Sequence, residues 1–151
     1  MHTPLFAEIL HKGADLRFKV TGRSMYPFLA DNDIVTLRKA DACSLKTGDI
    51  IFFLSDHDTP VLHRIIARSK AAKGRNCFIT KGDRLFQPDR PVPETRILGR
   101  VCSVEKNSTL HWFKKQNHNS PAWRVLNPMI AWLSRLRVYH YSARFVGLLV
   151  K

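Results

Sequence analysis

Between Leu16 and Val104, short runs rich in valine, isoleucine, phenylalanine and threonine alternate with glycine, proline, aspartate and asparagine. The runs are LRFKVTG, DIVTLRKA, GDIIFFLS, PVLHRIIARS, NCFITKGD and RILGRVCSV. Their spacing of roughly ten residues, with no helical periodicity between them, favours antiparallel strands over a βαβ sheet. The sequence therefore predicts a mainly β fold in which antiparallel strands close into a barrel or a sandwich.

The segments outside these runs divide the chain into four parts. Residues 1–15 are predicted to form a short amphipathic helix ended by Gly13, with its apolar stripe at Leu5, Phe6, Ile9 and Leu10. The β domain is expected over residues 16–105, and a polar, basic linker over 106–120. Residues 121–151 form a basic C-terminal extension, so the 151 residues suit one compact domain with a tail.

The C-terminal extension combines an apolar stripe with cationic residues. The apolar positions follow helical spacing at Val125, Leu126, Met129, Ile130, Leu133 and Leu136, and the polar flank contains Arg124, Ser134, Arg135 and Arg137. Such a helix can lie on an anionic membrane with Trp123 and Trp132 at the interface, and Phe145, Val146 and Leu148–Val150 could deepen the contact. Alternatively, its apolar face packs against the β domain.

Charge and residue usage restrict the partners and cofactors. Lysine and arginine number 25 against 12 acidic residues, and a net charge of +13 favours an anionic partner. Nucleic-acid binding is not predicted, because no helix-turn-helix, RNA-recognition or zinc-finger pattern accompanies the basic residues around Trp112, Phe113 and Trp123. The histidines lack metal-ligand spacing, and we see no glycine-rich phosphate loop, so we expect neither a metal nor a cofactor.

Cysteine spacing and hydropathy give two further expectations. Cys43, Cys77 and Cys102 lie far apart without a C-x-x-C motif, and we interpret them as buried free thiols. No run of 18 apolar residues and no cleaved signal peptide is visible, so the sequence predicts a cytoplasmic or peripheral membrane protein.

One serine and one histidine stand out as candidates for chemistry. Ser24 lies in GRSMYPFL, where Pro27 stiffens the chain that presents it. A serine becomes a nucleophile only beside a base, and His63 in PVLHRIIA is the candidate because an imidazole can titrate near neutral pH. The alternative is a turn serine and a histidine of the core with one hydrogen bond.

Two aspartates could orient that histidine. Asp83 and Asp89 lie in TKGDRLFQPD, a turn-rich segment in which a carboxylate could accept an imidazole N–H. Either residue is a candidate, and each also has an ordinary interpretation as a turn residue.

Taken together, GRSMYPFL, LKTGDIIFF, VLHRIIA, TKGDRLFQPD and RILGRV follow the order and rough spacing of blocks in the signal peptidase family of serine proteases. The resemblance covers residues 20–104 and is nearest to the histidine-type members, of the archaeal and endoplasmic-reticulum kind. It implies a β barrel shared with repressor-cleaving proteases, and cleavage of a peptide or preprotein. It also implies Ser24 as nucleophile with its own backbone N–H as oxyanion donor, His63 as base, and Asp83 or Asp89 as orienter.

Two alternatives remain open at the level of sequence. Arg84-Leu85 follows Gly82-Asp83, where family members often have Asn-Asn or Arg-Asp, so the chain could be a weakly active or inactive peptide-binding protein on the same fold. It could also be a soluble, repressor-type self-cleaving protease, although that class favours lysine at the position of His63.

Overall fold

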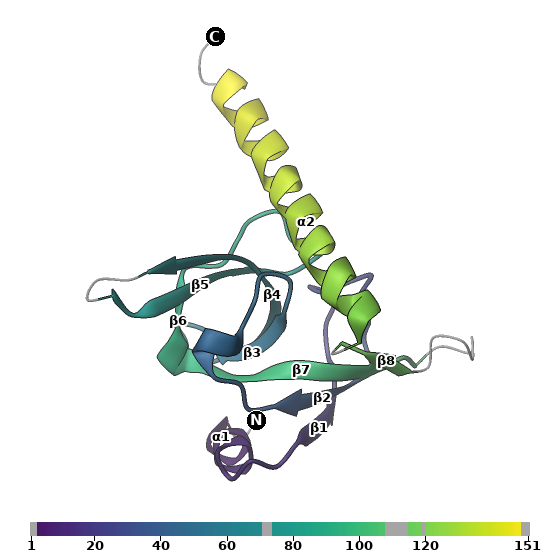
Figure 1. Cartoon of the computed structure of the whole chain (residues 1–151). Coiled ribbons are helices and arrows are strands. Elements are labelled where there is room, and N and C mark those ends of the chain that lie inside the picture. The colour runs from purple at the N-terminus through teal and green to yellow at the C-terminus, as the bar shows by residue number, and fades with distance from the viewer. Residues whose placement is uncertain (1–2, 71–73, 108–114, 119, 149–151) are drawn as a thin grey trace.

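The computed structural model describes residues 3–70, 74–107, 115–118 and 120–148 (Figure 1). Its main element is one antiparallel sheet in the order β1-β2-β7-β3-β4-β5-β6, with β8 paired to β7. The strands are β1 (Leu16–Lys19), β2 (Ile34–Arg38), β3 (Ile50–Leu54), β4 (Pro60–Lys70), β5 (Asn76–Lys81), β6 (Val92–Pro93), β7 (Ile97–Glu105) and β8 (Lys115–Asn117). The helices are α1 (Thr3–His11) and α2 (Pro121–Leu148). The sheet curls into a half-barrel, with α1 and α2 on opposite sides (Figure 1).

The mainly β, antiparallel architecture confirms the prediction, and each of the six predicted runs contains one strand. Two strands were missed. β6 has two residues and β8 has three, which is too short for an alternating pattern to be visible in sequence. β8 lies inside the segment predicted to be a linker, residues 106–120, and extends the sheet beyond β7.

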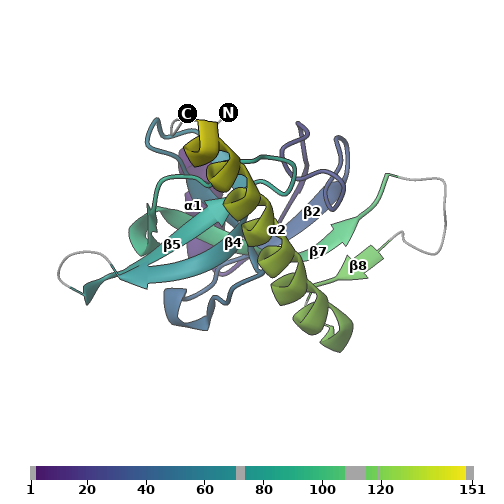
Figure 2. The ribbon, with the colours of Figure 1, turned by 90° about the horizontal axis from the view of Figure 1, so that it is seen from above.

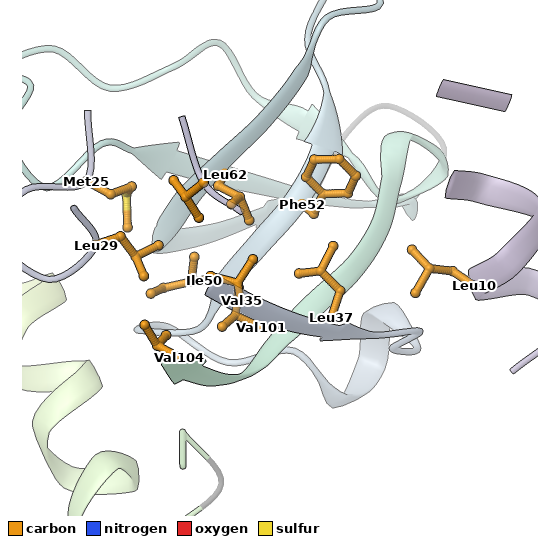
Figure 3. Close-up of a cluster of buried hydrophobic side chains, with 11 residues drawn as sticks. Leu10, Met25, Leu29, Val35, Leu37, Ile50, Phe52, Leu62, Val101 and Val104 are labelled. Carbon is orange, nitrogen blue, oxygen red and sulfur yellow. The ribbon is translucent and has the colours of Figure 1, made fainter. Parts of the chain in front are cut away.

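The core lies on both sides of β3, the strand between β4 and β7. Successive side chains of a strand point to opposite faces, so Ile50 and Phe52 enter one apolar cluster while Ile51 and Phe53 enter another. The first cluster extends from Leu10 of α1 to Met25 and Leu29, at its other end (Figure 3). Burying each large apolar side chain contributes about 1.5–3 kcal/mol.

Helix α1 covers one end of the first cluster. Leu10 is buried, and the Phe6 ring lies 6.1 Å from the rings of both Phe18 and Phe52. Leu5, which belongs to the same predicted stripe, is exposed. The predicted amphipathic helix is therefore present, and a part of its stripe makes the contact.

Helix α2 packs on the sheet with a face that sequence did not predict. It crosses β4 (Figure 2), and its buried residues are Asn127, Ile130, Ala131 and Ser134. The predicted stripe is divided, because Ile130 is buried whereas four of its other members are exposed: Val125, Leu126, Met129 and Leu133. Trp132, predicted as an interfacial residue beside the stripe, is exposed too. The helix does contact the β domain, as one of the two interpretations required, but mostly through other residues.

Some residues that the sequence analysis singled out cannot be compared with the structure. The side chains of Leu136, Arg137, Phe145, Val146 and Leu148–Val150 lie outside the described residues, as do Trp112 and Phe113. Cys77 and Cys102 are buried free cysteines, whereas Cys43 is exposed, so that expectation was wrong for Cys43, which lies in the short 3-10 helix Ala42–Ser44. In the described part of the chain, no helix is long and apolar enough to cross a membrane.

Gly48 permits the close approach of α2 to the sheet. Its φ of +99° is in the left-handed region, and a Cβ there would lie 2.5 Å from the carbonyl carbon of Asn127. A side chain at this position therefore meets both backbone strain and the backbone of α2. Its N–H also donates to Ile65 O, which fixes the turn before β3.

We expect Gly48→Ala to lower the free energy of unfolding by more than about 3 kcal/mol, because strain and overpacking add. Gly13→Ala is the matched control, since Gly13 has a φ of +80° but nothing within 4 Å of a Cβ. Left-handed strain alone costs about 1–2 kcal/mol. Urea unfolding of the two variants measures the difference, and equal losses would contradict the tight contact at Gly48.

His118 joins the end of the sheet to the start of α2. Its ring stacks on Trp123 with 4.4 Å between ring centres, and the backbone N–H of His118 donates to the carbonyl oxygen of Cys102. Nε2 is buried and has no hydrogen-bond partner in the described part of the chain. Burial lowers the pKa of the imidazole to about 4, and the positive charges of Arg64 and Lys106 add to this effect.

A neutral His118 makes folding pH-dependent. Between its folded pKa of about 4 and the usual value of 6.5, the unfolded chain binds the proton and the folded protein does not. The free energy of unfolding therefore has its full value above pH 6.5. It decreases as the pH falls toward 4, by about 2–4 kcal/mol in all. His118→Phe keeps a ring on Trp123 but cannot titrate, so its unfolding free energy should fall less over this range. Parallel pH profiles of the two proteins would contradict the assignment.

Candidate active site

Ser24 is presented by a loop between β1 and β2 that is anchored in the core. The next residue, Met25, and also Leu29 are buried in the first apolar cluster, at its end away from α1 (Figure 3). Leu29 N–H donates to Met25 O at 2.9 Å, and Gly22 N–H donates to the Asp31 carboxylate at 2.9 Å. The half-buried Ser24 is thus held between a fixed turn and a buried anchor.

A buried ion pair fixes the other end of this loop. The Asp33 carboxylate lies 2.8 Å from Lys106 Nζ and accepts hydrogen bonds from the N–H groups of Ala30 and Asn107. Lys106 Nζ also donates to Phe28 O. Several donors therefore satisfy a carboxylate that is 2% exposed, and these contacts hold this end of the loop in place.

His63 lies in the middle of β4, paired with Ile51 of β3. Its ring is buried, and Nδ1 is 2.6 Å from Asp89 Oδ2, which also accepts a hydrogen bond from Thr80 Oγ1 at 2.7 Å. An ionised carboxylate only accepts hydrogen bonds, so Nδ1 carries the proton in this pair. Nε2 of the neutral ring is then the basic nitrogen.

Gly82 brings the Ser24 loop and His63 together. A Cβ on Gly82 would lie 2.7 Å from the backbone carbonyl oxygen of Ser24 and 3.0 Å from His63 Nε2, so both groups occupy the space that a side chain at this position would need. The backbone N–H of Arg84 donates to the backbone carbonyl oxygen of Ser24 at 2.9 Å. This bond holds the turn after β5 against the loop that presents Ser24. Nε2 therefore faces the Ser24 segment. Among the described residues, no hydrogen bond joins the Ser24 hydroxyl to the imidazole.

Ser24 and His63 line the same cavity, of about 340 Å³. Its wall is largely apolar and is formed by Phe18, Val20, Met25, Phe52, Val61 and Leu62. A cavity with an apolar wall and a few polar groups at one place suits an apolar side chain of a ligand whose backbone lies at the polar groups.

Asp83 lies apart from His63, in a different interaction. Its carboxylate binds Arg64 in a bidentate pair, with Nε to Oδ1 at 2.9 Å and Nη2 to Oδ2 at 2.8 Å. Arg64 follows His63 in β4, and alternation along the strand directs the two side chains to opposite faces. Of the two aspartates that sequence left open, Asp89 contacts the imidazole and Asp83 contacts the guanidinium.

Arg64 is fully buried and joins four parts of the chain. Its Nη1 donates to Gly48 O at 2.8 Å and to Asn127 Oδ1 of α2 at 2.9 Å, and its guanidinium lies 5.3 Å from the centre of the Phe28 ring. Helix α2 is therefore hydrogen-bonded to the residue next to His63, and Phe28 belongs to the loop that presents Ser24.

Sequence reasoning missed Arg64, Thr80, Gly82 and Asn127 as contributors to the site. Arg64 and Lys81 pair across β4 and β5, and both are fully buried, although they interrupt apolar runs. A charge inside a buried strand requires partners, so this pattern was a usable signal. Lys81 Nζ donates to Leu85 O at 2.7 Å, which ties its ammonium to the turn that contains Gly82.

Comparison with models of known protein families finds no match for the chain. Comparison with curated proteins finds no similar sequence either.

The two aspartates should differ in their effect on stability. Asp83→Asn removes the counter-charge of a guanidinium that is 0% exposed, and breaking one side of a buried ion pair costs about 3–5 kcal/mol. The Asp89 side chain is 27% exposed, so Asp89→Asn should cost about 1 kcal/mol. Urea unfolding of both variants tests this difference. A larger loss for Asp89→Asn would contradict the roles that the contacts indicate.

Proposed function

We propose that this protein is a serine endopeptidase resembling the histidine-type signal peptidases. The observation that carries the proposal is the His63–Asp89 pair at 2.6 Å, because it leaves Nε2 basic and facing the Ser24 segment at the wall of a cavity. A serine, an imidazole and a carboxylate with these relations are the groups that acyl transfer needs.

The proposed reaction uses these groups in sequence. Ser24 Oγ attacks the carbonyl carbon of the scissile bond while its proton moves to His63 Nε2, and the backbone N–H of Ser24 stabilises the oxyanion. The imidazolium, held by Asp89, then protonates the leaving amine as the carbon–nitrogen bond breaks. Water, deprotonated by the same imidazole, hydrolyses the acyl-enzyme. The hydroxyl and imidazole come into hydrogen-bond contact on substrate binding, as catalytic groups often do.

The substrate is an extended peptide or preprotein. Within the described sheet, β1 pairs with β2 alone, so its other edge has backbone groups open to a ligand strand. Phe18 and Lys19 of this strand, with Val20 and Thr21 after it, line the cavity beside Ser24. A peptide added at this edge could place one apolar side chain in the cavity and its carbonyl near the hydroxyl.

The family resemblance supports the same proposal. The blocks that carry it include Ser24, His63 and Gly82, and these residues lie together although they are distant in sequence. In addition, Gly82 leaves room for both neighbours, which gives a physical reason for the glycine in the Lys81-Gly82-Asp83 block.

A peptide-binding protein without useful turnover is the second candidate. The observation that favours it is that no hydrogen bond joins Ser24 to His63 in the described residues, so the nucleophile is not yet activated. Such a protein would use the same cavity and strand edge and would not release products.

Ser24→Ala should abolish peptide cleavage, because it removes the attacking atom and little core volume. Losses in serine proteases reach about a millionfold. His63→Ala should cost nearly as much, since members of one catalytic unit are not additive. The measurement is mass spectrometry of a peptide library, with small residues at many positions, after incubation with each protein.

The matched control is Ser44→Ala, which removes an exposed hydroxyl whose hydrogen bond goes to Asp41 O. Turnover equal to wild type in Ser24→Ala would exclude Ser24 as the nucleophile. Binding of library peptides by the wild-type protein without any cleavage would favour the second candidate.

A further inference from the structure

The exposed face of α2 is the largest set of exposed apolar side chains in the described part of the chain. Val125 is 71% exposed and Trp132 is 59% exposed, and Leu126, Met129 and Leu133 accompany them. At 100° per residue these five positions form one continuous stripe, opposite the face that contacts β4. A stripe of this kind on a helix that is already packed on its own domain indicates a second contact.

One flank of the stripe is cationic. Arg124 and Arg135 are both exposed and lie on one side of it. All 12 acidic residues of the protein lie at or before Glu105, so residues 106–151 contain eight lysines and arginines and no acid. This charge favours an anionic partner for the helix and disfavours a second copy of the same face.

We infer that α2 binds an anionic lipid surface, with its axis along the surface and Val125, Met129 and Trp132 inserted among the acyl chains. A basic helix with an apolar stripe and an interfacial tryptophan has the composition that such binding requires. The positive charge of the acid-free segment attracts an anionic surface, with Lys106 excluded because it is paired with Asp33, whereas a protein groove would need acidic residues arranged to match. The inference does not depend on the proposed peptidase activity.

Binding does not require the protein to rearrange. The contact of α2 with the domain uses Asn127, which is bonded to Arg64, and Ile130, which is buried, whereas the lipid would meet the opposite face. Deleting the helix is consequently a poor test, because it would remove an acceptor of a buried guanidinium. Point substitutions on the exposed face leave this contact unchanged.

The experiment is co-sedimentation of the full chain with vesicles. We expect binding to vesicles of mixed phosphatidylcholine and phosphatidylglycerol, weakening as salt rises, and little binding to phosphatidylcholine alone. Met129→Glu should reduce the partition coefficient by at least about tenfold, since it places a carboxylate in the stripe. The matched control is Leu5→Glu, because Leu5 and Met129 are both 50% exposed and Leu5 lies on α1, across the sheet.

The results that would overturn the inference are distinct. One is failure of the wild-type protein to sediment with anionic vesicles, and another is equal binding by wild type and Met129→Glu. Equal binding to neutral vesicles would remove the role of charge. Self-association that Met129→Glu abolishes, without vesicle binding, would assign the stripe to a second copy. Circular dichroism of each variant checks that the fold is retained.

Discussion

The structure depends on the buried ion pair of Arg64 and Asp83. A guanidinium with no exposure is costly to remove from water, and it is tolerated only when its donors are satisfied. Arg64 makes four hydrogen bonds, two to Asp83 and one each to Gly48 O and Asn127 Oδ1. The turn before β3, the turn after β5 and helix α2 are therefore held in one arrangement by one side chain.

The candidate site is built directly on this pair. His63 precedes Arg64 in β4, and Gly82 precedes Asp83, so each member of the ion pair fixes the backbone of a neighbour that faces Ser24. A strand directs successive side chains to opposite faces, which lets one short segment supply a charge for the interior and an imidazole for the cavity. Adjacent residues of β4 therefore have different partners. Arg64 binds Asp83 in the interior, and His63 binds Asp89 beside the cavity.

The two faces of helix α2 differ in burial. The face with Asn127 and Ile130 joins the domain, so the apolar stripe around Met129 remains exposed. An isolated amphipathic pattern would direct that stripe to the core. Here the hydrogen bond of Arg64 to Asn127 and the close approach permitted by Gly48 decide the orientation, and the apolar stripe stays exposed.

The sequence by itself determined most of the strands and the four residues first considered for the candidate site. Alternation and turn residues located β1–β5 and β7, because that pattern is local. Ser24, His63, Asp83 and Asp89 were predicted as candidates for acyl-transfer chemistry, and Asp83 instead binds Arg64. Only the tertiary structure decided which aspartate meets His63, which face of α2 is buried, and that β8 extends the sheet. These depend on contacts between residues far apart in the chain, 26 positions for His63–Asp89 and 63 for Arg64–Asn127. Local periodicity carries no information about such pairings, since they follow from packing and from the need to satisfy buried charge.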